Sequence, residues 1–428
     1  MPAVEYPRLE ETLYHERLDN GLDVFVLPKP GFTKTFAVFA TRFGSADNRF
    51  RLGDGREFAV PDGLAHFLEH KMFEEPDGDV FARFAANGAS ANAYTGFDQT
   101  VYLFSATRNV DRCLDILLDF VQNPYFTDAN VEKEKGIIIQ EIQMYRDNPD
   151  WRVYFGLLEA LYHRHPVRID IAGTPESVSS ITKELLYECH RVFYHPSNMH
   201  LFVVGGVDPE RTMETVRANQ ARKRFDPPAG LERLSADEPE DAKEPMRQAT
   251  LAVAMPKCYV GFKEAGGNLS GERAIRRDLA ARIVLDALFS RSSPVYQEMY
   301  DEHLVFDSFG AQFTSGPGYA FSAIGGDTRD PGEMVRRVTE AMERTAERGL
   351  DPDVFERIRR KKIGAHLRLW NSPEAVAGEF VRFRHRGGDL FRLVELYESL
   401  TLEEANGWLR AHVHPSRRAV SVMRGDAS

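Results

Sequence analysis

The chain has 428 residues, of which 43% are hydrophobic and 28% charged, and these proportions exclude a disordered or fibrous protein. At about 100–200 residues per domain, this length predicts at least two domains. The 65 Asp and Glu residues outnumber the 54 Lys and Arg residues, and the net charge of −11 argues against nucleic acid or an anionic membrane surface as a partner.

The first residues and the cysteines indicate a compartment. Residues 1–21 contain neither the basic segment nor the apolar segment of a secretory signal, and no apolar run comes near the roughly 18 residues that a membrane span needs. We therefore expect a cytoplasmic protein. Cys113, Cys189 and Cys258 lack the paired spacing of a thiolate zinc site and the even number of a disulfide framework, so we expect three small buried residues.

The first half of the chain contains alternating apolar runs and a short helical segment. Residues 36–43 (FAVFATRF) and 100–107 (TVYLFSAT) predict β-strands. Between them, residues 64–73 predict a helix for which Asp62 is a candidate N-cap. Residues 88–97 (GASANAYTGF) predict a short strand of small and polar residues outside a tightly packed core. The alternative for this segment is an ordinary edge strand with a glycine bulge.

A candidate metal motif lies on the predicted helix. His66, Glu69 and His70 stand at positions i, i+3 and i+4, which share one helix face. Two imidazoles one turn apart can bind Zn²⁺ at about 2.0–2.1 Å and leave the carboxylate to take a proton from the water on the metal. This HxxEH spacing is the inverted form of the HExxH zinc-protease helix. Taken alone, the motif leaves a structural histidine pair equally open.

A third ligand can come from the amphipathic stretch at residues 128–148. Glu134 and Glu141 are seven residues apart and share one face after two helical turns. Isoleucines surround Glu141, and a carboxylate on an apolar stripe is unfavourable unless it is paired or bound to a metal. The alternative is a salt bridge to a neighbouring cation, Lys133, Lys135 or Arg146.

The chain contains one internal repeat. Residues 182–197 (TKELLYECHRVFYHPS) align without a gap with residues 401–416 (TLEEANGWLRAHVHPS) at a shift of 219, and in both copies an apolar strand follows the helix. A weaker match at a shift of 224 aligns residues 131–150 with residues 355–374. The repeated His-Pro is expected to stop each helix.

The repeat predicts an α+β fold with two similar domains. We expect each to be a mostly antiparallel sheet with helices packed on one face, so that two facing halves enclose a cavity. The predicted boundaries are residues 1–221 for the N-terminal domain, residues 222–249 for a linker rich in Pro, Asp and Glu, and residues 250–428 for the C-terminal domain.

Three of these segments together carry a family resemblance. With HFLEH at 66–70, NAYT at 92–95 and EKGIIIQE ending at Glu141, the chain resembles the inverzincin metallopeptidases, which include pitrilysin, insulin-degrading enzyme and mitochondrial processing peptidase. The resemblance covers nearly the whole chain. It is closest to the half-length bacterial processing-peptidase-like subunits, two of which form one clam-shaped chamber.

The resemblance implies a zinc endopeptidase that acts on peptides or unfolded segments. It makes His66, His70 and Glu141 the ligands of one Zn²⁺ per chain and Glu69 the general base, while Glu134 supports a ligand from outside the metal. The chemistry of the motif assigns the same roles independently.

The resemblance also implies a role for the strand at 88–97. It is expected to be an edge strand whose backbone pairs with an extended peptide substrate, with Asn92, Ala93 and Tyr94 in contact with it. Strand addition lets main-chain hydrogen bonds supply affinity, while side-chain pockets add a limited sequence preference.

The second half has apolar residues where the first half has its metal motif. The two shifts place Leu285, Leu288 and Phe289 opposite the HxxEH residues, and Ala365 opposite Glu141. We therefore expect one zinc per chain and a second domain that is not catalytic.

One departure from the family concerns partners. Where the family commonly has an Arg and a Tyr that contact substrate, this chain has Tyr300 and Phe306, and neither can donate the charged hydrogen bond that an Arg offers. We expect a homologous partner subunit to supply the Arg and Tyr in a heterodimer, with a homodimer as the other option.

Two further functions stay open at this stage. The first is a non-catalytic binding or assembly subunit of a processing-peptidase-like complex, against which the intact Glu69 argues. The second is a zinc hydrolase of another bond, against which the peptide-pairing strand argues.

Overall fold

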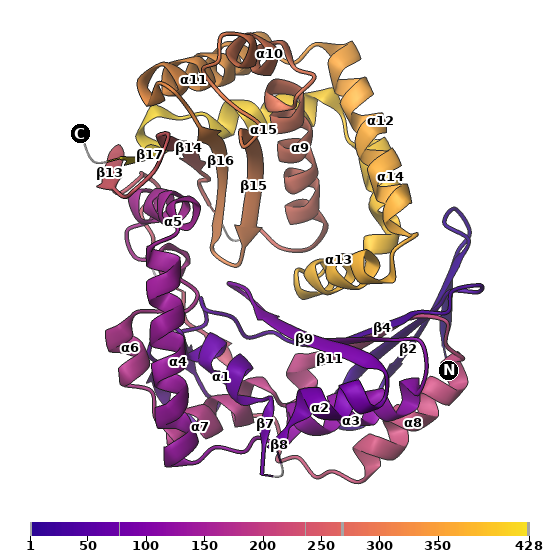
Figure 1. The fold of residues 1–428 in the computed structure, drawn as a ribbon. Coiled ribbons are helices and arrows are strands. Elements are labelled where there is room, and N and C mark those ends of the chain that lie inside the picture. Colours follow the sequence, from indigo (N-terminus) through magenta and orange to yellow (C-terminus); the bar gives the residue numbers. More distant parts are fainter. Residues whose placement is uncertain (1, 77, 236, 267–268, 426–428) are drawn as a thin grey trace.

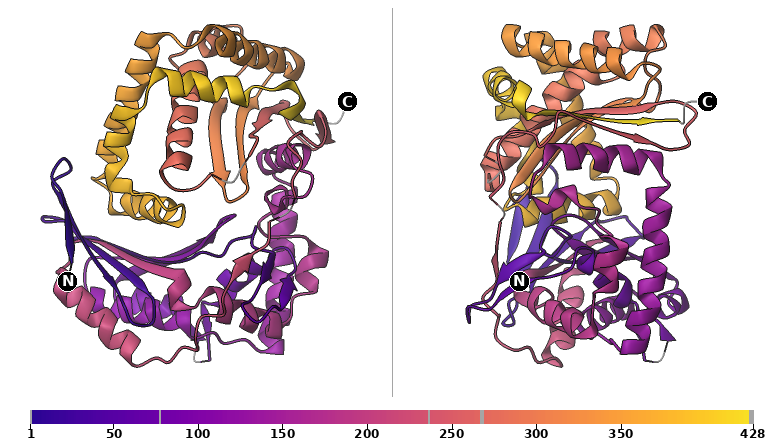
Figure 2. Two further views of the ribbon diagram at one scale, coloured as in Figure 1. Left: turned by 180° about the vertical axis from the view of Figure 1, so that it is seen from behind. Right: turned by 90° about the vertical axis from the view of Figure 1, so that its left-hand side faces the viewer.

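The structure is a computed structural model and describes residues 2–76, 78–235, 237–266 and 269–425. The chain has the predicted α+β class, with one main sheet and several helices in each half (Figure 1). The first half, drawn from indigo to magenta, and the second half, drawn from orange to yellow, stay stacked on one another when the molecule is turned (Figure 2).

The first half is built on a seven-stranded mixed sheet. In spatial order its strands are β1 (Ala3–Tyr6), β2 (Glu11–Arg17), β3 (Asp23–Pro28), β11 (Met199–Gly205), β4 (Thr35–Thr41), β10 (Thr100–Ala106) and β9 (Ala89–Thr95). Only the pairing of β3 with β11 is parallel. The strands predicted at 36–43, 88–97 and 100–107 are confirmed as β4, β9 and β10, and β9 lies at the sheet edge.

The remaining elements of the first half are mostly helices. The helices are α1 (Leu64–Lys71), α2 (Val80–Ala86), α3 (Val110–Gln122), α4 (Asp128–Arg146), α5 (Pro149–Leu161), α6 (Pro175–Ser179), α7 (Lys183–Phe193) and α8 (Pro209–Ala221). The short strands are β5 (Arg49–Arg51), β6 (Glu57–Ala59), β7 (Glu74–Glu75), β8 (Gly78–Asp79) and β12 (Glu232–Arg233).

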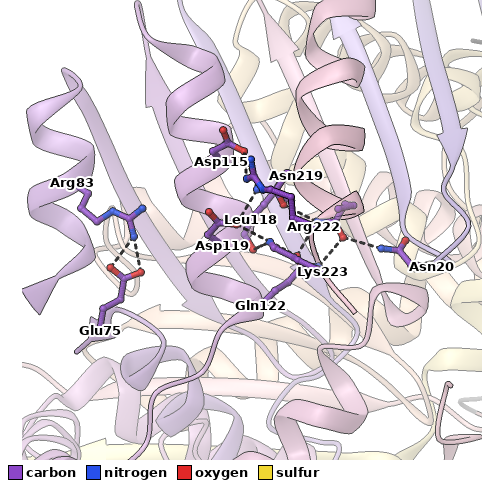
Figure 3. Close-up of polar contacts among 11 residues, drawn as sticks. Asn20, Glu75, Arg83, Asp115, Leu118, Asp119, Gln122, Asn219, Arg222 and Lys223 are labelled. Carbon is purple, nitrogen blue, oxygen red and sulfur yellow. Dashed lines mark hydrogen bonds and ion pairs between the residues drawn. The ribbon is translucent and has the colours of Figure 1, made fainter. Parts of the chain in front are cut away.

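Polar contacts join α3 to α8 in the first half (Figure 3). The Asn219 side-chain amide donates hydrogen bonds to Asp115 and Asp119, each at 2.9 Å. Just beyond α8, the Lys223 ammonium donates to the Leu118 carbonyl at 2.9 Å. The opposite side of α3 carries its buried apolar residues, so the amphipathic pattern of this helix matches a packed inner face and a polar outer face.

The second half is built on a five-stranded sheet. Its strands, in order, are β13 (Met246–Thr250), β17 (Arg418–Arg424), β14 (Lys257–Lys263), β16 (Tyr319–Asp327) and β15 (Gly310–Gly316), with β13 parallel to β17 and the other pairings antiparallel. The helices are α9 (Gly271–Phe289), α10 (Pro294–Asp301), α11 (Pro331–Arg348), α12 (Pro352–Leu369), α13 (Pro373–His385), α14 (Leu393–Ser399) and α15 (Leu402–His412).

The two halves exchange one helix each. Helix α5 of the first half packs on β14 and β17, and α13 of the second half packs on β4 and β11. On α13, the Phe380 ring stacks on Phe202 with centroids 4.1 Å apart and meets Phe25 at 5.0 Å. The prediction of helices on only one face of each sheet is therefore wrong, because the exchanged helix covers part of the second face.

The internal repeat is confirmed element by element. The order α7, a 3₁₀ turn at Pro196–Asn198 and β11 recurs as α15, a 3₁₀ turn at Pro415–Arg417 and β17, and every boundary is displaced by the predicted 219 residues. At the weaker match, α5 and α13 have bounds 224 residues apart. Each of the two helices ends just before its His-Pro pair, as expected. His195 and His414 then cap the 3₁₀ turns that follow.

The segment between the halves is anchored to both of them. It contains β12, which pairs with β5, and the start of β13. Between these strands, the buried Glu238 carboxylate accepts backbone hydrogen bonds from His163 at 2.8 Å and His165 at 2.7 Å and pairs with Lys263 at 2.5 Å. Because His163 and His165 follow α5, this contact also fixes the exchanged helix.

Two smaller predictions concern the cysteines and the membrane. All three cysteines are free and buried, as expected. Within the described residues, every helix is too short or too polar to span a bilayer.

Candidate metal centre

Helix α1 begins at a glycine that the local geometry requires. Gly63 has φ +87°, and a Cβ at this position would lie 2.3 Å from the Ala172 carbonyl oxygen, so only glycine fits. The predicted N-cap at Asp62 is wrong. The Asp62 carboxylate instead accepts a hydrogen bond from the Asn48 side chain at 2.9 Å, and no side chain caps the helix.

The three motif residues lie together on one face of α1. Leu64, Phe67 and Leu68 are fully buried in the core of the first half, which turns the HxxEH face toward α4 and β9. The His66 side chain is 8% exposed, and the centroids of its ring and the His70 ring are 4.5 Å apart.

Helix α4 brings Glu141 to the two histidines. The helix starts with a capping box at Thr127 and packs against α1. The Glu141 Oε2 atom lies 3.5 Å from His70 Nε2 and 3.8 Å from His66 Nε2. Tetrahedral zinc with bonds of about 2.0–2.1 Å separates its ligand atoms by about 3.3–3.4 Å, so the three atoms have nearly the spacing that a zinc ion requires.

The hydrogen bonding of Glu141 fits a metal ligand. Its Oε1 accepts a hydrogen bond from Tyr145 at 2.8 Å, whereas its Oε2 is buried and has no hydrogen-bond partner among the described residues. His66, His70 and Glu141 are also the one group of potential ligands found in the described chain whose donor atoms lie within 4.8 Å of one another. The alternative of a salt bridge to Lys133, Lys135 or Arg146 is wrong, since within the described residues the ion-pair contacts of Glu141 are to the two histidines.

Glu134 holds His70 from outside the proposed metal position. His70 Nδ1 lies 3.0 Å from Glu134 Oε1, and because a carboxylate only accepts, Nδ1 carries the proton and Nε2 faces Glu141. The fully buried Lys71 ammonium lies 3.8 Å from Glu134 Oε2. Burial raises the pKa of Glu134, but the hydrogen bond from His70 and the nearby lysine charges outweigh it and lower the pKa overall.

The surroundings of the two histidines shift their pKa values in opposite directions. Burial, together with the adjacent His70, lowers the pKa of His66 to about 3, so this imidazole is neutral and able to bind a metal. For His70, burial lowers the pKa, but the hydrogen bond to Glu134 and the charge of Glu69 outweigh it and raise the pKa overall.

Glu69 lies beside the ligand group and contacts the edge strand. Its Oε2 accepts a hydrogen bond from the Thr95 hydroxyl of β9 at 3.1 Å. Burial raises the pKa of Glu69, which moves it toward the range of a general base that works near neutral pH.

Strand β9 is an edge strand with continuous register. It pairs with β10 from Ala89 opposite Ala106 to Thr95 opposite Thr100, so no glycine bulge interrupts the strand between these residues. Its other edge has no partner strand among the described residues. Ala93 stands opposite Tyr102 and belongs to the core beneath the sheet.

The predicted substrate-contacting residues are distributed over both faces of β9. Because side chains alternate along a strand, Asn92 and Tyr94 point away from the face on which Ala93 packs, and both are exposed. The structure therefore places the two larger side chains on the side that faces the second half, and the roles of all three residues stay predictions.

Several side chains of this site were not anticipated. Thr95 contacts Glu69 across two elements, and Tyr145 supports Glu141 while its ring stacks on Trp151 with centroids 4.8 Å apart. Tyr145 follows Glu141 by four residues on a predicted helix, so helical spacing could have identified it. Nothing local could have identified Thr95.

In the second half, the equivalent region is an apolar helix contact. Leu285, Leu288 and Phe289 are buried on α9, which packs against α12, the helix that carries Ala365. Tyr300 lies on α10, where its ring stacks on Tyr296. Figures 1 and 2 place α10 at the end of the molecule away from α1.

Comparisons with known proteins agree on one family. Residues 53–175 match the insulinase family, peptidase family M16, and residues 180–362 match the M16 inactive domain. An uncharacterized zinc protease of Bacillus subtilis, YmfH, is 48% identical over 97% of both chains. An M16-like peptidase from Alicyclobacillus acidocaldarius has a TM-score of 0.95 at 43% identity and covers 99% of this chain and 100% of its own. Pitrilysin, at 16% identity and TM-score 0.75, shares the fold over 45% of its length.

Proposed function

The chain belongs to the insulinase family of zinc proteases, peptidase family M16, and from this premise we propose that it is a zinc endopeptidase acting on peptides or unfolded segments. The observation that carries the proposal is the convergence of His66, His70 and Glu141, whose ligand atoms lie within 4.8 Å of one another, beside a half-buried Glu69.

Each residue of the site has a definite task in this proposal. His66, His70 and Glu141 would hold one Zn²⁺ per chain, which supplies the acidity that lets water lose a proton near neutral pH. Glu69 accepts that proton and passes it to the leaving amine. The hydrogen bond from Thr95 keeps the Glu69 carboxylate in place, and Glu134 keeps His70 oriented.

The peptide would bind as an additional strand on the free edge of β9. The backbone of residues 92–94 would pair with it, and the side chains of Asn92 and Tyr94 would contact its residues. Because α1 packs directly beneath β9, a peptide on this edge passes the Glu69 carboxylate that Thr95 holds.

The partner prediction concerns Tyr300 and Phe306. Tyr300 lies on α10, at the far end of the molecule from α1 (Figure 1), so even an Arg at position 300 would not reach the metal centre of its own chain. We propose that this chain forms one half of a clam-shaped chamber and that a homologous subunit supplies the missing Arg and Tyr, in a heterodimer or, as the second option, a homodimer.

The absence of that Arg also favours a second function, a non-catalytic binding or assembly subunit. The two differ in the use of Glu69, because a subunit that only binds has no need for a half-buried carboxylate next to the metal ligands. The zinc hydrolase of another bond has no observation in its favour.

The test measures metal content and cleavage of a mixed quenched-peptide library. Wild type, Glu69→Gln and the control Glu132→Gln, an exposed glutamate on α4, are assayed alone and mixed with a homologous subunit from the same source. We expect about one zinc per chain in all three and cleavage by wild type and control only with the partner. Zinc without cleavage in any mixture would favour the assembly function, and absence of zinc would contradict the site itself.

A further inference from the structure

A small pocket lies between α9 and α13, outside the metal centre. Arg282, Arg382 and Arg386 line it together with Asp278, and the rest of its wall is apolar. Its free space holds about one water-sized group. Three guanidinium groups surround this small space in a chain of net charge −11. Their positive charges need anionic groups nearby to neutralise them.

Two of the three arginines have partners in the protein. Arg386 donates to Asp278 Oδ2 at 2.5 Å, and Arg382 pairs with Glu379 through two nitrogen atoms. The Asp278 carboxylate is not available to a further arginine, because it also accepts hydrogen bonds from Ser315 at 2.8 Å and from a neighbouring arginine at 3.0 Å.

Arg282 is the exception. In the described part of the chain it forms neither a hydrogen bond nor an ion pair, and its ionised form is favoured by more distant groups, namely Tyr397, Glu379 and Asp278. Burial and the adjacent Arg382 lower its pKa, although a guanidinium still keeps its proton in a protein. A half-buried cation without a partner is unfavourable, and an anion from outside would relieve it.

The pocket adjoins the edge strand that is proposed to bind substrate. The end of α13 touches the β9–β10 turn, where His385 Nδ1 lies 3.0 Å from Gln99 Oε1, and Figure 1 shows α13 lying between β9 and α9. Asp98 of the same turn is near enough to Arg386 and Arg382 for their charges to oppose the rise that burial causes in its pKa.

A side chain of β9 also lies near the charged residues of α13. Tyr94 is 40% exposed, but its partial burial raises its pKa to about 12, and the nearby carboxylates of Asp98 and Glu379 add to that rise. Glu379 is the partner of Arg382. The face of β9 that carries Tyr94 therefore looks toward the helix that contributes two of the three arginines.

We propose that Arg282, between Arg382 and Arg386, binds a carboxylate of the peptide that pairs with β9, and that the enzyme accordingly selects acidic peptides. This inference rests on the proposed function. An arginine fork binds a carboxylate through two charged hydrogen bonds. The carboxylate comes either from an Asp or Glu side chain or from the peptide C-terminus.

The experiment measures binding rather than cleavage. Zinc-loaded Glu69→Gln protein is titrated with four fluorescent peptides of one sequence at about 0.15 M salt, where exposed charges are well screened. They carry either Glu or Gln in the middle and either a free or an amidated C-terminus. The peptide with the recognised carboxylate should bind roughly tenfold more tightly than its neutral counterpart. The pair of peptides whose affinities differ shows whether that carboxylate is the Glu side chain or the C-terminus.

Variants assign the difference to the pocket. Arg282→Gln in the Glu69→Gln protein should abolish the preference, and Arg282→Lys, which keeps the charge but not the fork, should retain part of it. The matched control is Arg273→Gln, which removes the same charge from an exposed position on α9 and should leave the preference intact.

Equal or undetectable affinity for the four peptides would overturn the proposal, as would loss of the preference in the Arg273→Gln control. The proposed function can fail separately. If the wild type never cleaves but keeps the carboxylate preference, the endopeptidase function is excluded and the carboxylate-binding pocket stands. Cleavage without any preference for a carboxylate would exclude only the carboxylate-binding role of the pocket.

Discussion

The two halves of the chain build the same unit and use it differently. Helices α4 and α5 correspond to α12 and α13, and the α7–β11 unit recurs as α15–β17. In the first half, the helix that packs on α4 carries two histidines and a glutamate. In the second half, the corresponding residues of α9 are Leu285, Leu288 and Phe289. The comparison teaches that this fold forms without the metal centre.

The comparison also separates stability from chemistry. Around α1, charged groups are buried together, among them Lys71 at 0% and Glu134 at 8% exposure, and such networks contribute little net stability because desolvation offsets their attraction. Around α9, apolar side chains fill the same place. Substitutions in the metal motif of α1 should therefore affect function, and substitutions at the equivalent apolar positions of α9 should affect folding.

The largest expected effect comes from Glu69→Gln. Removal of the base should lower the cleavage rate of the partnered enzyme by roughly 10²–10⁴-fold without lowering its unfolding midpoint or its zinc content. Steady-state cleavage, metal analysis and urea unfolding measure the three quantities.

The matched substitution in the second half is Leu288→Ala. It should reduce the free energy of unfolding by about 2–5 kcal/mol and leave zinc content unchanged. The contrast between the two halves would be contradicted if Leu288→Ala released the metal, or if Glu69→Gln kept its activity.

The next effect concerns the exchanged helix. Phe380→Ala on α13 removes the ring that stacks on Phe202 of the other half and should destabilise the chain by about 3–5 kcal/mol. Since the halves share helices, far-UV circular dichroism and tryptophan fluorescence should report one coincident urea transition. Leu367→Ala, at an exposed position on α12, should change stability by less than about 0.5 kcal/mol. Two separate transitions would show that the halves are independent.

The fold could be predicted from the sequence only where local patterns decide it. Helical spacing placed His66 with His70 on one helix and Glu134 with Glu141 on another, because helix geometry fixes which residues share a face; the family resemblance selected Glu141 as the third ligand. The same reasoning failed at Asp62, which is a common capping residue type, because the left-handed turn and the close Ala172 carbonyl at Gly63 determine where the helix begins. The exchange of α5 and α13 depends on contacts between distant segments, which no local pattern contains.

A smaller effect is expected from Glu134→Gln. The neutral amide holds His70 more weakly, so zinc affinity should fall by roughly 10–100-fold, while activity at saturating zinc largely persists. Competition with a zinc chelator measures the affinity, with Glu132→Gln as the control on the same helix. An unchanged zinc affinity would show that the 3.0 Å contact has no influence on the metal.

The smallest effect is a pH dependence at the segment between the halves. Burial raises the pKa of Glu238, but Lys263 and the backbone N–H groups after α5 outweigh it and lower the pKa overall. A lowered pKa contributes stability above the unfolded value, about 4.3, which is lost as the pH falls through the folded value. Glu238→Gln should therefore destabilise the protein at pH 7 and progressively less below about pH 4.

Urea midpoints across this pH range test the Glu238 prediction. Asp237→Asn, a change at a fully exposed carboxylate, serves as the control and should show no such dependence. A Glu238→Gln difference that stays constant with pH would contradict the assignment.

The most direct test of the central claim is a crystal structure of the zinc-loaded protein with anomalous scattering recorded at the zinc edge. The account predicts one peak per chain, about 2.0–2.1 Å from His66 Nε2, His70 Nε2 and Glu141 Oε2, with Glu134 outside bonding distance and no peak between α9 and α12. A peak bound by other residues, or no peak at α1, would contradict it.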